Sequence, residues 1–245
     1  MKAPNLVSLA AIPTEDLWEI LETARNLKLE SKAGVRHDML AGKTLAMIFQ
    51  KPSLRTRVSF ETGMWQLGGH AIYLGPGDIK LGQRETTEDI ALNLSRYVDG
   101  IMARVFEHRT IAELAEHATV PVINGLCDRY HPCQGLADLL TVQEKKRGFE
   151  GLTLAFIGDG NNVAHSLING CAKVGMAFRI ACPEGFEPER ADRERSTRSR
   201  REHRDPPRPA RGRGGRRRPL HRRLGQHGTG GGSRVEAKCV RRFHD

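Results

Sequence analysis

The run Ser53, Leu54, Arg55, Thr56 and Arg57 has residue types that suit an anion. It follows a predicted strand and begins a predicted helix. The unpaired N–H groups and the dipole at a helix N-terminus favour negative charge. Two guanidinium groups and two hydroxyls add charge-assisted donors that match a phosphate. The run therefore predicts a phosphate site, and the alternative is a capped helix with solvated arginines.

A second run, His131, Pro132, Cys133 and Gln134, begins another predicted helix. Proline suits the first helical position. His131 and Gln134 are three residues apart, so both can point to one side of the helix entrance. A neutral imidazole and an amide there could stabilise a polarised carbonyl oxygen. The alternative is a histidine that caps the helix or packs in the core.

Two further positions could bear on chemistry. Arg104 ends a short predicted strand, where open α/β sheets place ligand groups, although a surface charge is the alternative. The run from Gly158 to Asn162 lies between a strand and a helix, and its glycines permit a tight turn. It lacks the last glycine of a dinucleotide fingerprint because Val163 takes that place.

Alternating periodicities predict the elements that position these residues. We expect helices over 14–32, 53–67, 86–96, 110–117, 132–146 and 161–174, and strands over 44–49, 70–74, 100–103, 121–124, 152–157 and 177–181. Thr14 is expected to cap the first helix. Strands that alternate with helices predict a doubly wound α/β fold with a parallel sheet.

Composition divides the chain into three parts. Residues 1–147 form a first α/β domain, and residues 148–187 begin a second, truncated one. Residues 188–245 form a basic tail that is expected to be disordered, because it offers too little apolar surface to offset ordering entropy. The net charge of +10 arises in this tail, since positions 190–245 hold 18 arginines and one lysine against six acidic residues.

Cysteine usage and hydropathy indicate a cytoplasmic protein. Cys127, Cys133, Cys171, Cys182 and Cys239 are odd in number and include no CxxC pair, which fits a reducing compartment. We find no signal peptide and no apolar run long enough to cross a bilayer.

Taken together, the SxRTR run, Arg104, the HPCQ run and the GDGNN run occur in the order and spacing of the carbamoyltransferases. The chain resembles this family over about residues 1–187. HPCQ and GDGNN are similar to the ornithine enzyme, whereas the aspartate enzyme usually has another residue at Cys133. One departure is Lys80, which stands where many members have Gln or His.

The resemblance implies a role for each motif residue. Ser53, Arg55, Thr56 and Arg57 would bind the phosphate of carbamoyl phosphate, with Leu54 inside the same run. Catalytic Arg104, His131 and Gln134 would polarise its carbonyl, with Pro132 and Cys133 in the motif, and Asn162 would bind ornithine.

The implied reaction gives citrulline and phosphate in arginine biosynthesis, and it needs no metal or organic cofactor. The implied assembly is a homotrimer. Related acceptors stay open: putrescine, acetylornithine or aspartate.

The tail does not follow the family pattern beyond about Pro188. An abrupt change to Arg, Gly and Pro is typical of a shifted reading frame in GC-rich DNA, so we hypothesise a frameshift near codons 185–200. We expect carbamoyl phosphate binding with little turnover from such a chain. The alternative is a non-catalytic basic protein that binds nucleic acid through the tail, and non-specific binding is expected from the charge alone.

Overall fold

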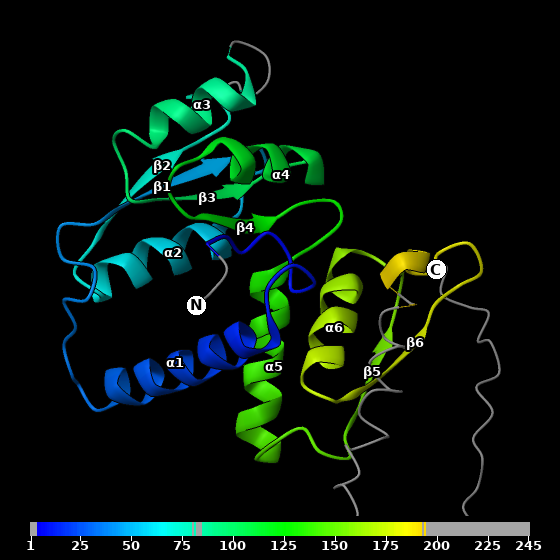
Figure 1. Cartoon of the computed structure of the whole chain (residues 1–245). Coiled ribbons are helices and arrows are strands. Elements are labelled where there is room, and N and C mark those ends of the chain that lie inside the picture. Colours follow the sequence, from blue (N-terminus) through cyan, green and yellow to red (C-terminus); the bar gives the residue numbers. More distant parts are fainter. Residues whose placement is uncertain (1–3, 80, 82–84, 193, 195–245) are drawn as a thin grey trace, which may run out of the picture.

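The computed structural model describes residues 4–79, 81, 85–192 and 194 (Figure 1). Its larger sheet has four parallel strands in the order β2-β1-β3-β4. The strands are β1 (Thr44–Phe49), β2 (His70–Leu74), β3 (Gly100–Arg104) and β4 (Val122–Leu126). An isolated parallel bridge between Leu6 and Ile123 adds the N-terminal segment beside β4.

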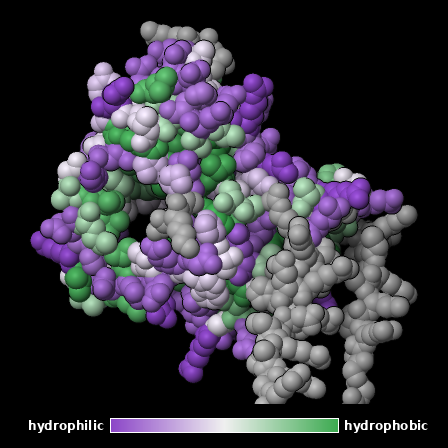
Figure 2. Space-filling model, viewed as in Figure 1, coloured by the Kyte–Doolittle hydropathy of each residue, from purple (hydrophilic) through white to green (hydrophobic). Residues whose placement is uncertain are grey.

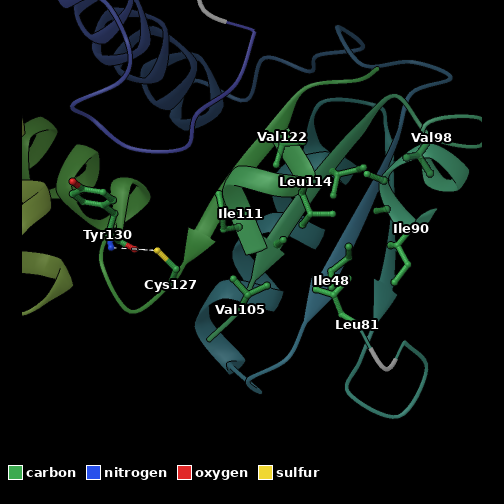
Figure 3. Packing of buried hydrophobic residues seen from close by; sticks show 14 residues of the cluster. Ile48, Leu81, Ile90, Val98, Val105, Ile111, Leu114, Val122, Cys127 and Tyr130 are labelled. Atoms are coloured by element: carbon green, nitrogen blue, oxygen red, sulfur yellow. Dashed lines mark hydrogen bonds between the residues drawn. The ribbon is translucent and has the colours of Figure 1, made fainter. Parts of the chain in front are cut away.

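Helices cover both faces of this sheet. Helices α3 (Thr87–Leu94) and α4 (His108–His117) lie on one face, and α2 (Leu54–Gln66) lies on the other (Figure 1). Side chains of β1 alternate between the two: Ile48 joins the core under α3 and α4, whereas Met47 and Phe49 join the core beside α2. Figure 3 shows the first of these cores. The predicted doubly wound α/β fold is therefore confirmed.

A second, two-stranded parallel sheet begins after α5 (Pro132–Lys146). It consists of β5 (Thr153–Ile157) and β6 (Ala177–Ala181), joined by α6 (Asn162–Lys173). Apolar side chains of α5 and α6 share one core with those of α1 (Thr14–Lys32). The two sheets are thus connected by a continuous layer of packed helices.

Several predicted element ends need correction. Thr14 is the first helical residue of α1, and Pro13 occupies the cap position without a side-chain hydrogen bond, so the predicted Thr14 cap is wrong. Helix α4 begins at His108, two residues early, because Glu107 takes the cap position. Strand β4 extends to Leu126, which pairs with Arg104 across an irregularity.

Residues 188–192, which the sequence assigned to a disordered tail, are ordered in the structure. Pro188 and Asp192 are buried, and Glu189 forms an ion pair with Arg129 at 2.7 Å. Composition did not reveal this because the partners lie far away in the sequence. The rest of the tail, including Cys239, lies outside the described residues, as does Lys80.

Candidate functional site

The candidate site lies at the carboxyl edge of the larger sheet. From β1 the chain crosses to β2 on one side, and β3 and β4 follow on the other side. The loops after β1 and β3 therefore separate at this point, where open α/β sheets bind ligands. Phe49 pairs with Arg104 in register, and the Gln50 N–H donates to the Arg104 carbonyl at 2.9 Å.

Ser53 begins α2 and fixes the first turn. Its hydroxyl accepts from the Thr56 N–H at 3.4 Å and donates to the Thr56 hydroxyl at 3.0 Å. Arg104 reaches this turn from β3, and its Nη1 donates to the Thr56 hydroxyl at 3.4 Å. The structure thus brings together Ser53, Thr56 and Arg104.

Three arginines lie at or beside this turn. Burial, and then the charge of Arg55, lowers the pKa of Arg104, which places two guanidinium groups within electrostatic reach. Arg57 pairs with Glu61 at 3.0 Å and lies over the Tyr73 ring at 4.0 Å. The excess positive charge beside a helix N-terminus favours an anion. Leu54 is 78% exposed and contributes no polar group to the site.

His131 occupies the N-cap position of α5, but its side chain makes no capping hydrogen bond. Pro132 follows at the first helical position. Burial, and then the charge of Arg104, lowers the pKa of His131 to about 4, so its imidazole is neutral at pH 7. Within the described part of the chain, His131 Nδ1 and Arg104 Nε are buried without a hydrogen-bond partner. Two buried polar atoms without partners favour an incoming polar ligand.

Gln134 and Cys133 are held by their neighbours. The Gln134 amide donates to Asp138 Oδ1 at 2.9 Å, while burial raises the pKa of Asp138. The Cys133 thiol donates to the Asn124 carbonyl at 3.5 Å, and burial raises its pKa to about 12. Cys133 is therefore a neutral packing residue, and one N–H of the Gln134 amide donates to Asp138, which leaves the second N–H of this amide for a ligand.

Residues 186–188 pack against the turn from Gly158 to Asn162. Asn161 caps α6, and its side chain accepts from the N–H groups of Val163 and Ala164. The Gly160 N–H donates to the Phe186 carbonyl at 2.7 Å, and a Cβ on Gly160 would lie 2.1 Å from the nitrogen of Pro188. The close approach that this glycine permits is thus made by residues 186–188.

Asn162 does not point freely toward an acceptor. Its Nδ2 donates to the Cys127 carbonyl at 2.6 Å. Two residues of the same helix, His165 and Ser166, also contact the loop before α5 and were missed by the sequence reasoning. Their spacing from Asn162, three and four residues, places all three on one helix face and was the available signal.

Two features are absent from the residues that the structure describes, a metal-ligating cluster and a membrane-spanning helix. No group of three His, Cys, Asp or Glu side chains there could hold a metal ion. Within the same residues, no helix combines the length and apolar character that a membrane span requires.

Comparisons with known proteins agree with the motifs. The aspartate/ornithine carbamoyltransferase carbamoyl-P binding domain matches residues 4–144, and the Asp/Orn binding domain matches residues 150–205. The second match extends past the predicted domain end at residue 187.

Relatives and solved structures carry the same name. An ornithine carbamoyltransferase of Pyrococcus abyssi is 54% identical over 77% of this chain and 60% of its own length. The anabolic ornithine carbamoyltransferase of Pyrococcus furiosus is 55% identical over 76% of this chain and 59% of its own length.

The solved ornithine carbamoyltransferase from Pyrococcus furiosus has a TM-score of 0.79 at 52% identity, covering 81% of this chain and 63% of that one. The chain thus spans about three fifths of the length of the curated relatives. Because the carbamoyl-P binding model alone matches more than half of its residues, the chain belongs to the aspartate/ornithine carbamoyltransferase family.

Proposed function

We propose that the chain binds carbamoyl phosphate and transfers the carbamoyl group to the δ-amine of ornithine, giving citrulline and phosphate, with little turnover because the residues beyond Pro188 depart from the family pattern. The observation that carries the proposal is the convergence of Arg104, His131 and the first turn of α2. Two polar atoms there, Arg104 Nε and His131 Nδ1, are buried and lack a partner among the described residues. A carbamoyl phosphate ligand would supply acceptors for both.

The proposed chemistry is a direct transfer. The amine nitrogen attacks the carbamoyl carbon, the bond from that carbon to the phosphate oxygen breaks, and the amine loses a proton. Ser53, Arg55, Thr56 and Arg57 hold the departing phosphate, and Arg104 and His131 stabilise the charge that develops on the carbonyl oxygen. Gln134 joins them through its second amide N–H, since one N–H donates to Asp138.

The acceptor is proposed to be ornithine because the relatives carry that name. Asn162 binds its amino-acid end through the side-chain oxygen, since the side-chain nitrogen donates to Cys127. In domain terms, residues 1–147 bind carbamoyl phosphate and the part after residue 148 contributes to the acceptor side. Putrescine, acetylornithine and aspartate serve as comparison substrates in the test.

Calorimetry with carbamoyl phosphate tests binding separately from turnover. Arg57→Ala removes a guanidinium from the site and should weaken binding roughly tenfold or more. Arg109→Ala is the matched control, because Arg109 also lies in the first turn of its helix and pairs with a glutamate four residues on. Equal affinity of both variants would refute the site. Citrulline formation from ornithine, compared with the products of the other amines, tests the acceptor.

We also propose a homotrimer in the cytoplasm. Helix α2 fully buries none of its residues, and its Leu54 and Trp65 are 78% and 77% exposed. Figure 2 shows hydrophobic side chains at the surface on the side where α2 lies. Patches of this kind mark contact surfaces, and sedimentation velocity would measure the assembly. Nucleic-acid binding by the basic tail stays a prediction, since that segment lies outside the described residues.

A further inference from the structure

The first turn of α6 holds the loop that carries His131. Asn162 Nδ2 donates to the Cys127 carbonyl at 2.6 Å, and His165 Nδ1 contacts the Arg129 carbonyl at 3.0 Å. The Ser166 hydroxyl accepts from the His131 N–H at 2.8 Å. Side chains on one helix face thus bind backbone groups of every second residue from Cys127 to His131.

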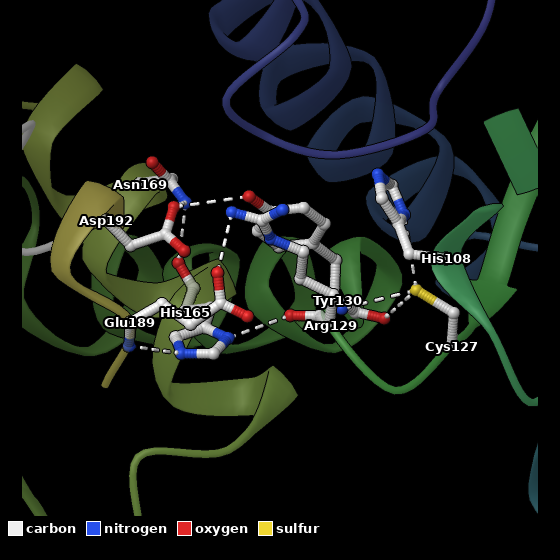
Figure 4. Close-up of polar contacts among 8 residues, drawn as sticks. All are labelled: His108, Cys127, Arg129, Tyr130, His165, Asn169, Glu189 and Asp192. Atoms are coloured by element: carbon white, nitrogen blue, oxygen red, sulfur yellow. Dashed lines mark hydrogen bonds and ion pairs between the residues drawn. The ribbon is translucent and has the colours of Figure 1, made fainter. Parts of the chain in front are cut away.

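Hydrogen bonds fix the orientation of the two buried side chains, those of His165 and Ser166. His165 Nε2 accepts from the Glu189 N–H at 3.0 Å, so Nδ1 carries the proton and donates to the Arg129 carbonyl (Figure 4). The Ser166 hydroxyl donates to the Asn162 carbonyl at 2.9 Å, which leaves its lone pairs facing the His131 N–H. Both side chains are buried, at 5% and 0% exposure, so water does not compete for these bonds.

Two side chains of the same loop are anchored by the segment that contains Glu189 and Asp192. The Tyr130 hydroxyl donates to Asp192 Oδ1 at 3.2 Å, and Asn169 Nδ2 donates to the same oxygen at 3.0 Å. Arg129 pairs with Glu189 at 2.7 Å. The loop is therefore fixed through both its backbone and its side chains, as Figure 4 shows.

We propose that Ser166 is a positioning residue that keeps the His131 imidazole buried beside Arg104. The bond to Ser166 holds the His131 backbone at the point where Pro132, which lacks an N–H, begins α5. Helix α6, on the proposed acceptor side, thereby positions His131, on the carbamoyl phosphate side. This inference deepens the proposed function, because His131 is its carbonyl-polarising group.

The test follows the His131 imidazole by NMR during a pH titration of the full chain. Ser166→Ala leaves the His131 N–H without its acceptor, so the loop should shift and expose the ring. The pKa of His131 should then rise from about 4 toward the ordinary 6.5. The affinity of the chain for inorganic phosphate should also fall, by roughly tenfold, because the bond from the His131 N–H to Ser166 is lost beside the charged site.

Ser95→Ala is the matched control. The Ser95 hydroxyl donates to the Ala91 carbonyl, four residues earlier, and accepts from the Thr119 N–H at 3.0 Å. Ser95 thus makes the same pair of bonds as Ser166, but neither of its two partners belongs to the candidate functional site. The His131 titration should therefore be unchanged in Ser95→Ala. An unchanged titration in folded Ser166→Ala would overturn the proposal.

Amide exchange in the unmodified chain provides a measurement that needs no variant. If Ser166 holds His131, the His131 N–H exchanges as slowly as the buried amides of α6, and rapid exchange would overturn the inference. Both readouts are independent of turnover. Failure of the unmodified chain to bind carbamoyl phosphate would count against the proposed function alone, and an unchanged His131 titration in Ser166→Ala would count against the positioning role alone.

Discussion

His131 and Arg104 illustrate how one half-buried pair sets the chemistry of the candidate site. Burial removes water from both groups, and the fixed charge of Arg104 further disfavours a proton on His131. The result is a neutral imidazole beside a cation. Such a pair can donate to a carbonyl oxygen without the imidazole itself adding a second positive charge at rest.

The lowered pKa of His131 predicts a pH-dependent stability. Its folded pKa of about 4 lies below the ordinary 6.5, so the unfolded chain binds the proton more tightly between these values. This contribution is fully favourable above pH 6.5 and is lost as the pH falls toward 4. After allowance for solvent screening, we expect the loss to be roughly 2 kcal/mol.

Urea unfolding at pH 7 and at pH 4.5 would measure this effect against a His131→Gln variant. The glutamine variant should lose less stability than the parent on acidification. Parallel losses in both proteins would show that the imidazole is not buried as described.

Helix α6 combines two functions at the level of the element. Its first turn is capped by Asn161, and the turn before it contacts the chain at Phe186 and Pro188. The first turn of α6 also contacts the loop before α5. The glycine turn and the helix start therefore determine where the second half of the chain meets the first.

Gly160→Ala should destabilise the protein by roughly 2–4 kcal/mol, because its Cβ would collide with backbone atoms of residues 187 and 188. Gly63→Ala is the control within α2, where a Cβ meets nothing within 4 Å. That helical position should gain about 0.5–1 kcal/mol. Thermal unfolding of the two variants checks both signs, and a neutral Gly160→Ala would contradict the close approach.

For the whole molecule, the last described segment connects the two halves. Glu189 and Asp192 bind residues of the loop before α5 and of α6. Removing them would leave the Tyr130 hydroxyl and the Asn169 amide without this acceptor in a buried setting. Each such loss costs about 1–3 kcal/mol.

Two truncated chains isolate this contribution. A chain that ends at Glu187 should unfold several degrees below a chain that ends at Glu194, by roughly 4 °C or more for the expected loss. Circular dichroism melting of the pair measures the difference. Equal melting temperatures would mean that residues 188–194 add no stability.

The sequence by itself determined the order of strands and helices and predicted the residues of an anion site. Strong periodicity marks each element locally, and the arginines and hydroxyls from Ser53 to Arg57 lie on one helix start. Arg104 and His131 were candidates from their places at a strand end and a helix start, the family resemblance implied their roles, and the comparisons confirm that family. Thr14 was misread as a cap because a threonine at the first helical position has the same local signature.

Only the tertiary structure decided which of these side chains are free. Gln134 is bonded to Asp138, and Asn162 donates to Cys127, whereas His131 Nδ1 and Arg104 Nε lack partners in the described region. Contacts such as Ser166 with His131 join residues far apart in the chain. The strength of these hydrogen bonds depends on the burial of both partners and on the geometry between them, and neither can be inferred from composition or spacing.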